Sequence, residues 1–313
     1  MADEKRIATR VSYGETLVEL GAEHDDFVVL DADLAASTQT GMFQKAYPDR
    51  FFDVGIAEQN LMSLAAGIAA TGRVAFASSF AMFAAGRAYE QIRNSIGYPH
   101  LNVKVAASHA GISVGEDGAT HQCNEDIALM RSIPGMTVVV PADDVEARAA
   151  VRAAYETDGP FYLRLGRLAV PVVNDPKTYR FELGKGVVLR EGTDLTIVAC
   201  GLMVEAALKA ADLLAEKGVS AEVINIHTIK PIDDELLRAS AAKTGRVLTC
   251  EEHSIIGGLG DAVLSALSET PVPLRKLGVR DEFGYSGPAL ELLHEFGLDA
   301  EGIVREVEDF LAR

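Results

Sequence analysis

The stretch FFDVGIAEQNLMSLAAG, residues 51–67, carries the signal that decides the fold. It opens with a short apolar run, Phe51 to Val54, which stops at Gly55 as a buried strand and its following turn would. Beyond Glu58 the apolar residues recur at helical spacing, at Leu61, Leu64 and Ile68. The stretch therefore predicts a strand, a turn and a helix, with Glu58 at the edge of the sheet where the helix begins.

The carboxylate of Glu58 has two interpretations. An acidic residue in the first turn of a helix commonly does no more than complement the helix dipole. At the edge of a sheet the same carboxylate is also in a position to take part in chemistry. Other residues of the chain must decide between the two.

Length and composition limit the classes of protein. A chain of 313 residues is long for one core, since single cores stop growing near about 250 to 300 residues. A hydrophobic share of 48% with 24% charged residues excludes disorder, and the absence of any run of roughly 20 apolar residues excludes a membrane span. We therefore expect two globular domains.

Charge and cysteine content indicate which partners and which cellular compartment the protein has. A formal charge of −17 argues against nucleic acid or an anionic membrane as partner, since both require clustered cations. An anionic substrate would have to be met by a few placed arginines. The opening residues form no apolar signal segment, and Cys123, Cys200 and Cys250 have neither disulfide nor metal-ligand spacing, which predicts a cytoplasmic protein.

Helices and strands alternate along the chain. Because the strands are continuous apolar runs, parallel sheets covered by helices are expected, giving two doubly wound α/β domains. The domains are predicted at 1–169 and 187–313, with a linker at 170–186. Strands are predicted at 27–31, 51–54, 74–79, 103–107, 138–140, 161–165, 195–199, 221–226, 247–250 and 274–278. Helices are predicted at 12–20, 84–96, 144–157, 203–216, 234–242, 258–267 and 299–311, the first with Ser12 as cap and Glu15 as its capping-box partner.

A long loop, SHAGISVGEDGATHQ at 108–122, concentrates polar residues. Loops of this length without periodicity are uncommon in compact domains and tend to be functional. Glycines in turns and acids on a solvated face are the alternative interpretation. The loop's titratable residues are His109, Glu116, Asp117 and His121, and the two histidines are harder to assign to a plain surface loop.

The second domain offers one polar cluster, Glu251 to His253, predicted to follow a strand. The glycine-rich stretch IIGGLGDAV comes next, but it does not satisfy the GxGxxG pattern of nucleotide loops. Its glycines are expected to let a helix pack closely on the sheet.

Several motifs in matching order and spacing resemble those of the transketolase family. They are DADL at 31–34, DVGIAEQN at 53–60, SFAMF at 79–83, VGEDGATHQ at 114–122, RSIPGM at 131–136 and PAD at 141–143. The resemblance covers essentially the whole chain and corresponds to the C-terminal half of the family, the pyrimidine-binding domain plus the C-terminal domain. The family's diphosphate signature, GDG followed by paired asparagines, is absent. The chain thus resembles the second subunit of a split, two-chain transketolase. In the resembled family the C-terminal domain lies away from the chemistry and serves subunit contacts, so no catalytic role is expected for it here.

This resemblance implies thiamine diphosphate as cofactor. Glu58 would hydrogen-bond the cofactor's pyrimidine nitrogen and promote the imino tautomer of its amino group, which is the base for the thiazolium carbon. Phe80 and Phe83 would bracket the pyrimidine ring, although ordinary core packing is the alternative for both. Gly86 stands where the family has a tyrosine in that pocket. No metal ligand is expected here, because Mg²⁺ and the diphosphate would be held mainly by an N-terminal partner subunit in a heterotetramer of two copies of each chain.

The resemblance also implies a set of substrate residues. His109 and His121 would contact the sugar's hydroxyl or carbonyl groups, and Asp117 would bind a neighbouring hydroxyl. The terminal phosphate of the sugar would be held by Arg10, Ser37 and Arg167, since guanidinium groups suit a dianion. Either arginine alone would more simply be a surface charge.

Other functions stay open on the sequence alone. Within enzymes, 1-deoxyxylulose-phosphate synthases and the beta subunits of 2-oxo-acid dehydrogenases share the glutamate-bearing domain. A non-catalytic assembly or regulatory subunit with this fold is the alternative outside enzymes. Glu58 together with His109 and His121 favours an enzyme, because a non-catalytic chain has no physical need for such a polar loop.

Overall fold

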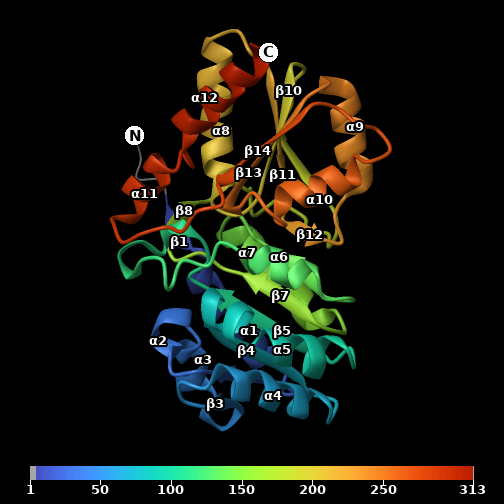
Figure 1. Ribbon diagram of the computed structural model, residues 1–313. Coiled ribbons are helices and arrows are strands. Elements are labelled where there is room, and N and C mark those ends of the chain that lie inside the picture. Colours follow the sequence, from blue (N-terminus) through green and yellow to red (C-terminus); the bar gives the residue numbers. More distant parts are fainter. Residues whose placement is uncertain (1–4, 313) are drawn as a thin grey trace. The chain divides into compact units, whose positions relative to one another are not determined.

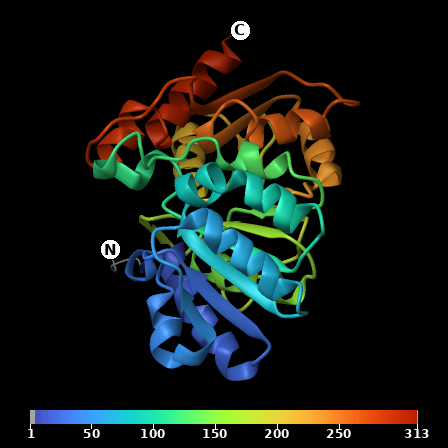
Figure 2. The ribbon, with the colours of Figure 1, turned by 60° about the horizontal axis from the view of Figure 1, so that its bottom comes forward.

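The computed structural model describes residues 5–312, which form two compact units. The first unit contains the residues up to Ala110 together with Leu129–Phe181, and the second contains Gly111–Ala128 together with the chain from Glu182 onward. The chain can be followed by colour from its N-terminal to its C-terminal end (Figures 1 and 2). The loop predicted at 108–122 is therefore divided, because most of it packs in the second unit.

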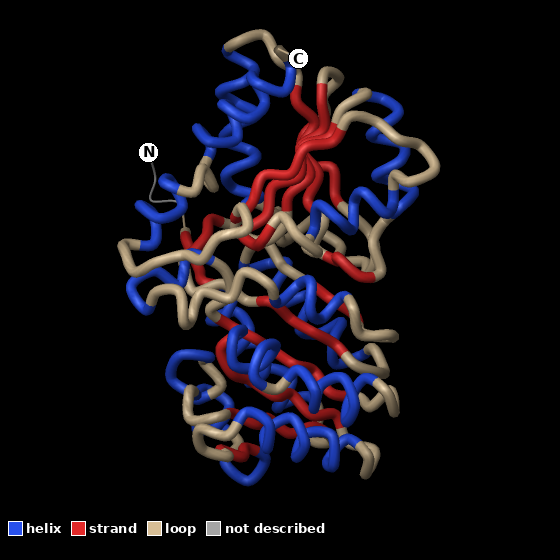
Figure 3. The backbone as a smooth tube through the Cα atoms, in the orientation of Figure 1, coloured by secondary structure: helices blue, strands red, loops and turns tan. Residues whose placement is uncertain are grey.

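The first unit is built on parallel strands in the order β6-β7-β5-β4-β2-β3. Their bounds are β2 Phe27–Asp31, β3 Phe51–Asp53, β4 Val74–Phe80, β5 Val103–Ser108, β6 Thr137–Val139 and β7 Phe161–Arg164. Most of these strands are buried along their whole length, as expected for parallel sheets covered by other elements. Figure 3 shows them as neighbouring red segments between helices.

The remaining elements of the first unit surround this sheet. They are β1 Arg6–Ala8, α1 Thr9–Glu23, α2 Ala35–Thr38, α3 Gly41–Ala46, η1 Pro48–Arg50, α4 Glu58–Ala69, η2 Met82–Arg87, α5 Tyr89–Gln91, η3 Ile92–Gly97, α7 Asp144–Glu156 and β8 Ala169–Pro171. Helix α6, Asp126–Arg131, spans the boundary between the units. Strands β1 and β8 form a separate antiparallel pair, with Ala8 opposite Ala169.

The second unit has a five-stranded sheet in the order β14-β13-β10-β11-β9, parallel except for β9. Its elements are η4 Ile112–Asp117, β9 Val187–Arg190, β10 Leu195–Ala199, α8 Met203–Glu216, β11 Ala221–Asn225, β12 Thr228–Lys230, α9 Asp234–Thr244, β13 Val247–Ser254, α10 Leu259–Ala266, β14 Leu274–Val279, α11 Ala289–Glu295 and α12 Ala300–Leu311. The predicted class, α/β with parallel sheets, is confirmed for both units. No helix within residues 5–312 is long and apolar enough to cross a membrane.

Two helix predictions are wrong at their ends or in their type. Helix α1 begins at Thr9 directly after β1, so its cap is Ala8, and Ser12 lies buried inside the helix without capping it. Glu15 instead forms an ion pair with Arg148. The helix expected at 84–96 is two π-helical segments joined by the three residues of α5. Such segments are frequent near functional sites, and apolar periodicity does not distinguish them from α-helix.

The segment expected to be a linker, 170–186, is held to the first unit over most of its length. Asp143 caps α7 by accepting a hydrogen bond from the backbone N–H of Glu146, and its second oxygen accepts those of Val173 and Asn174 at 2.8 and 2.7 Å. The hydroxyl of Tyr179 donates to Glu146. The PAD motif, which contains Asp143, therefore has a structural role.

Candidate functional site

Glu58 is the first residue of α4 and follows the end of β3, as predicted. The turn between them is held by Asp53, whose Oδ1 accepts the backbone N–H groups of Gly55 at 2.8 Å and Asp33 at 3.1 Å. Gly55 has a φ of +72°, which favours glycine. Although Glu58 is only 5% exposed, its sole charge partner within residues 5–312 is Arg87, with Nε 3.9 Å from Oε2. This distance is beyond hydrogen bonding, so the buried carboxylate keeps acceptor capacity.

An aromatic wall lies at the end of β4. Phe80 stacks on Phe83 with ring centroids 5.9 Å apart and on the His109 ring at 3.9 Å. A ring held between two others needs about 7 Å, twice the van der Waals contact distance. Phe80 and Phe83 therefore form one wall here, and bracketing of a third ring needs one of them to move. His109 is itself buried, and its Nδ1 is 2.9 Å from the hydroxyl of Ser108.

Gly86, which stands where the resembled family has a tyrosine, lies in η2 next to the side chain of Met82. A Cβ at position 86 would lie 2.1 Å from Cε of Met82. The space that a larger residue would need is therefore filled by a flexible thioether side chain.

In the first unit, Arg10 contacts Ser37 and feels the charge of Arg167. Arg10 donates from NH1 to the carbonyl oxygen of Ser37 at 2.6 Å, while the Ser37 hydroxyl has no hydrogen bond within residues 5–312. Burial and then the charge of Arg167 lower the pKa of Arg10, which places two cations near each other. Thr9 supports this arrangement, because its hydroxyl accepts the N–H of Gly166 at 2.8 Å. Two neighbouring guanidinium groups favour an anion between them.

Sequence reasoning missed Asp31, which shapes the turn that carries Ser37. Its carboxylate accepts hydrogen bonds from the hydroxyls of Thr38 and Thr40 at 2.7 and 2.8 Å and from the N–H of Leu34 at 2.7 Å. Burial raises the pKa of Asp31 to about 6. The available signal was that Asp31 and Asp53 both directly follow apolar strand residues, in the motifs DADL and DVGIAEQN.

Asp117 and His121 belong to the second unit, whereas the other predicted site residues belong to the first. Asp117 is exposed at the end of η4, and His121 is half-buried with Nδ1 2.9 Å from the hydroxyl of Thr120. Gly111, Gly115 and Gly118 all have φ between +73° and +81° along this loop. Backbone angles in this range favour glycine, which explains why these three positions of the loop are glycines.

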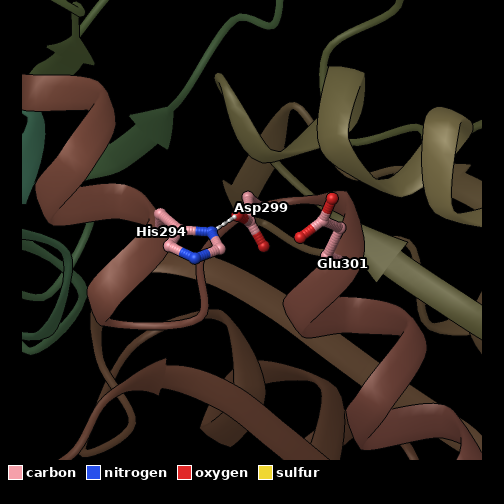
Figure 4. Close-up of side chains that lie close together, drawn as sticks. All are labelled: His294, Asp299 and Glu301. Atoms are coloured by element: carbon pink, nitrogen blue, oxygen red, sulfur yellow. Dashed lines mark hydrogen bonds and ion pairs between the residues drawn. The ribbon is translucent and has the colours of Figure 1, made fainter.

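A group of metal-ligating side chains, His294, Asp299 and Glu301, lies elsewhere in the second unit (Figure 4). Asp299 caps α12 by accepting the N–H of Gly302 at 2.7 Å, and its other oxygen is 2.6 Å from Nδ1 of His294. His294 and Glu301 are exposed. Helix capping explains the place of Asp299, and exposed acidic groups are common without an ion, so the group gives no reason to assign a metal.

Two family models match the chain. The transketolase pyrimidine binding domain matches residues 5–172, and the transketolase C-terminal domain matches residues 184–303. A solved structure described as a split gene transketolase, inactive beta4 tetramer, superposes with a TM-score of 0.90 at 56% identity, covering 97% of this chain and 98% of that one.

Relatives with similar sequences include subunits of transketolases. The 6-deoxy-6-sulfo-D-fructose transketolase subunit of Clostridium sp. (strain MSTE9) is 46% identical, over 97% of this chain and 94% of its own length. A subunit of the apulose-4-phosphate transketolase of Phocaeicola vulgatus is 40% identical, over 98% of this chain and 98% of its own length. Longer relatives exist too: the chain spans 47% of a 1-deoxy-D-xylulose-5-phosphate synthase from Geobacter sulfurreducens, at 39% identity.

Proposed function

The chain belongs to the transketolase family, and we propose that it is the pyrimidine-binding subunit of a two-chain transketolase that transfers a two-carbon ketol unit from a ketose to an aldose. The observation that carries this proposal is the buried carboxylate of Glu58, which starts α4 in the same unit as the aromatic wall of Phe80, Phe83 and His109. A carboxylate that only complemented the helix dipole could do so at the surface without the cost of burial.

The residues present are compatible with the pyrimidine end of thiamine diphosphate. Glu58 has unused acceptor capacity, which a protonated ring nitrogen would fill, and the phenylalanine wall offers a surface for stacking. When bound, the cofactor supplies a nucleophilic thiazolium carbon for the ketol group. In this proposal Glu58 shares the ring proton, and His109 and His121 donate or accept protons at the sugar's oxygens.

The substrate we propose is a sugar with a terminal anion. Arg10 and Arg167 lie near each other in the first unit, and the Ser37 hydroxyl is available beside them. Guanidinium groups bind phosphate and sulfonate alike, since both present several oxygens around a negative charge. The substrate named for one relative carries a sulfo group and that of the other a phosphate. In this proposal Asp117 adds specificity by binding a hydroxyl group of the sugar.

The diphosphate and Mg²⁺ are assigned in this proposal to a partner subunit of the N-terminal transketolase type, in an assembly with two copies of each chain. The three cysteines are buried and none forms a disulfide, which agrees with a reducing compartment, and we propose the cytoplasm.

The test is reconstitution with the partner chain. We expect ketol transfer from the mixture and negligible transfer by this chain alone. Glu58→Gln should lower the turnover of the mixture by about 10²- to 10⁴-fold, because a neutral amide does not share the ring proton. Glu235→Gln is the matched control, since Glu235 also stands in the first turn of a helix, α9, but is exposed. Equal losses in both variants would show that Glu58 serves only the helix dipole.

A second candidate is the 1-deoxyxylulose-phosphate synthase reaction, which the relative from Geobacter sulfurreducens supports. Supplying the mixture with pyruvate as donor separates the two, because only the synthase reaction releases carbon dioxide. Full activity of this chain in a verified single-chain preparation would contradict the two-chain proposal, and an inactive mixture would favour a non-catalytic subunit.

A further inference from the structure

Three consecutive buried polar residues, Glu251, Glu252 and His253, lie in the last part of β13 in the second unit. They are at most 4% exposed, and they lie within the strand instead of following it. Burying a carboxylate is costly unless hydrogen bonds compensate it, so the partners of these side chains indicate what the cluster does.

Glu251 holds the beginning of α10. Its Oε2 accepts the N–H of Leu259 at 2.6 Å and its Oε1 accepts that of Gly260 at 2.9 Å. A Cβ at Gly258 would lie 2.0 Å from Oε2, so this glycine is needed for the close approach. The glycine-rich stretch thus accommodates a carboxylate of the protein itself.

Glu252 and its neighbours hold the loop 111–128. Oε1 of Glu252 accepts the N–H of Ser113 at 2.5 Å. The N–H of Ala128 donates to Nε2 of His253 at 3.3 Å, and the N–H of Ser254 donates to the carbonyl of Asn124 at 2.7 Å. Successive residues of β13 therefore bond the beginning and the end of the loop.

The loop's own contacts complete this attachment. The N–H of Gly111 donates to the carbonyl of Cys123 at 2.8 Å, which closes the loop. Nε2 of Gln122 donates to the carbonyl of Tyr285, also in the second unit, at 3.0 Å. At Gly111 φ is +81°, and a Cβ there would lie 2.5 Å from Oε1 of Glu252. The Glu252 carboxylate thus occupies the space beside the loop's first residue.

We propose that Glu252 is a positioning residue that fixes the loop carrying Asp117 and His121. The C-terminal domain, expected from sequence to have no catalytic role, thereby takes part in presenting substrate-binding residues. The structural part of this inference concerns only the second unit, and its consequence for activity rests on the proposed function.

The neighbouring glutamates provide a matched pair of variants. Glu252→Ala removes the acceptor that holds the loop, whereas Glu251→Ala removes an equally buried acceptor that holds α10. Glu252→Gln keeps an oxygen that accepts the Ser113 N–H and should restore much of the effect. Gly111→Ala is an independent perturbation of the same contact from the loop side, which keeps the test usable if an alanine variant fails to fold.

The first measurement is hydrogen exchange of this chain alone, resolved by peptide. Loss of a hydrogen bond to a charged acceptor should speed exchange of residues 111–122 by roughly 10- to 150-fold in Glu252→Ala and in Gly111→Ala. In Glu251→Ala the faster exchange should instead appear at residues 258–262. Unchanged protection of the loop in Glu252→Ala, or the same exchange pattern in both glutamate variants, would overturn the inference.

The second measurement is ketol transfer by the mixture with the partner chain. Glu252→Ala should raise KM for the sugar and lower kcat/KM by about tenfold or more, Glu252→Gln should recover part of the loss, and Glu251→Ala should stay near wild type. A wild-type mixture without activity would refute the proposed function, while the exchange data would still decide whether Glu252 holds the loop. Full activity of a Glu252→Ala protein with an unprotected loop would overturn the functional part.

Discussion

Removal of Arg167 should weaken the binding of sugars with a terminal anion and leave the binding of uncharged sugars almost unchanged. Arg167→Ala takes away a charge-assisted hydrogen bond to the terminal anion, which contributes roughly 1.5 to 3 kcal/mol, so KM for a phosphorylated aldose should rise about 10- to 150-fold. KM for the same aldose without phosphate should hardly change. Arg10 stays in place in this variant, and the charge of Arg167, after burial, lowers the pKa of Arg10, so the two cations lie near enough to meet one anion.

The assay combines kinetics with thermal unfolding. Catalytic efficiencies are compared for a phosphorylated aldose, its dephosphorylated form and a sulfonated analogue, using the mixture with the partner chain. Inorganic phosphate alone should raise the Tm of the wild-type chain and leave that of Arg167→Ala almost unchanged. Arg180→Ala is the control, since Arg180 is an exposed arginine of the same unit. Identical preference ratios and Tm shifts in wild type and Arg167→Ala would refute the placement of the anion.

Three further predictions concern the residues that support the site. Thr9→Val should raise KM for the phosphorylated aldose in the same direction as Arg167→Ala but by less, about three- to tenfold in steady-state assays, because it frees the N–H of Gly166 and leaves both charges in place. Burial raises the pKa of Asp31 to about 6, so the unfolding free energy of wild type relative to Asp31→Asn should fall as pH rises from 4 to 6, by on the order of 2 to 3 kcal/mol in urea titrations. Burial lowers the pKa of Lys104 to about 7. The unfolding free energy of wild type relative to Lys104→Met should therefore increase as pH rises from 7 to 10, and a flat pH profile in urea titrations would contradict the burial of this amine.

Long apolar runs made the parallel sheets predictable. The strand 27–31 was predicted with its observed bounds, because this short apolar run is not long enough for a helix. The antiparallel pair β1 and β8 was missed, since strands of three residues carry no periodic signal. This pair matters for the candidate site, because it leads the chain to Arg10 on one side and follows Arg167 on the other.

The sequence singled out the residues of the candidate site but not the groups that support them. The motifs pointed to Glu58, Phe80 and His109, and the structure brings the last two into stacking contact. The hydroxyl and carboxylate groups that hold the turns were not foreseen, since Asp31 and Thr9 become informative only when distant backbone N–H groups are placed beside them. A single sequence does not contain these pairings.

The attachment of the loop to β13 has a consequence for how the protein is made. Ser113 and its acceptor Glu252 are 139 residues apart in the chain. At a synthesis rate of about 5 to 20 residues per second, the loop leaves the ribosome about 7 to 28 s before the strand that holds it. The nascent chain therefore carries Asp117 and His121 on an unattached segment throughout this interval, and any product that ends before residue 252 never acquires the attachment.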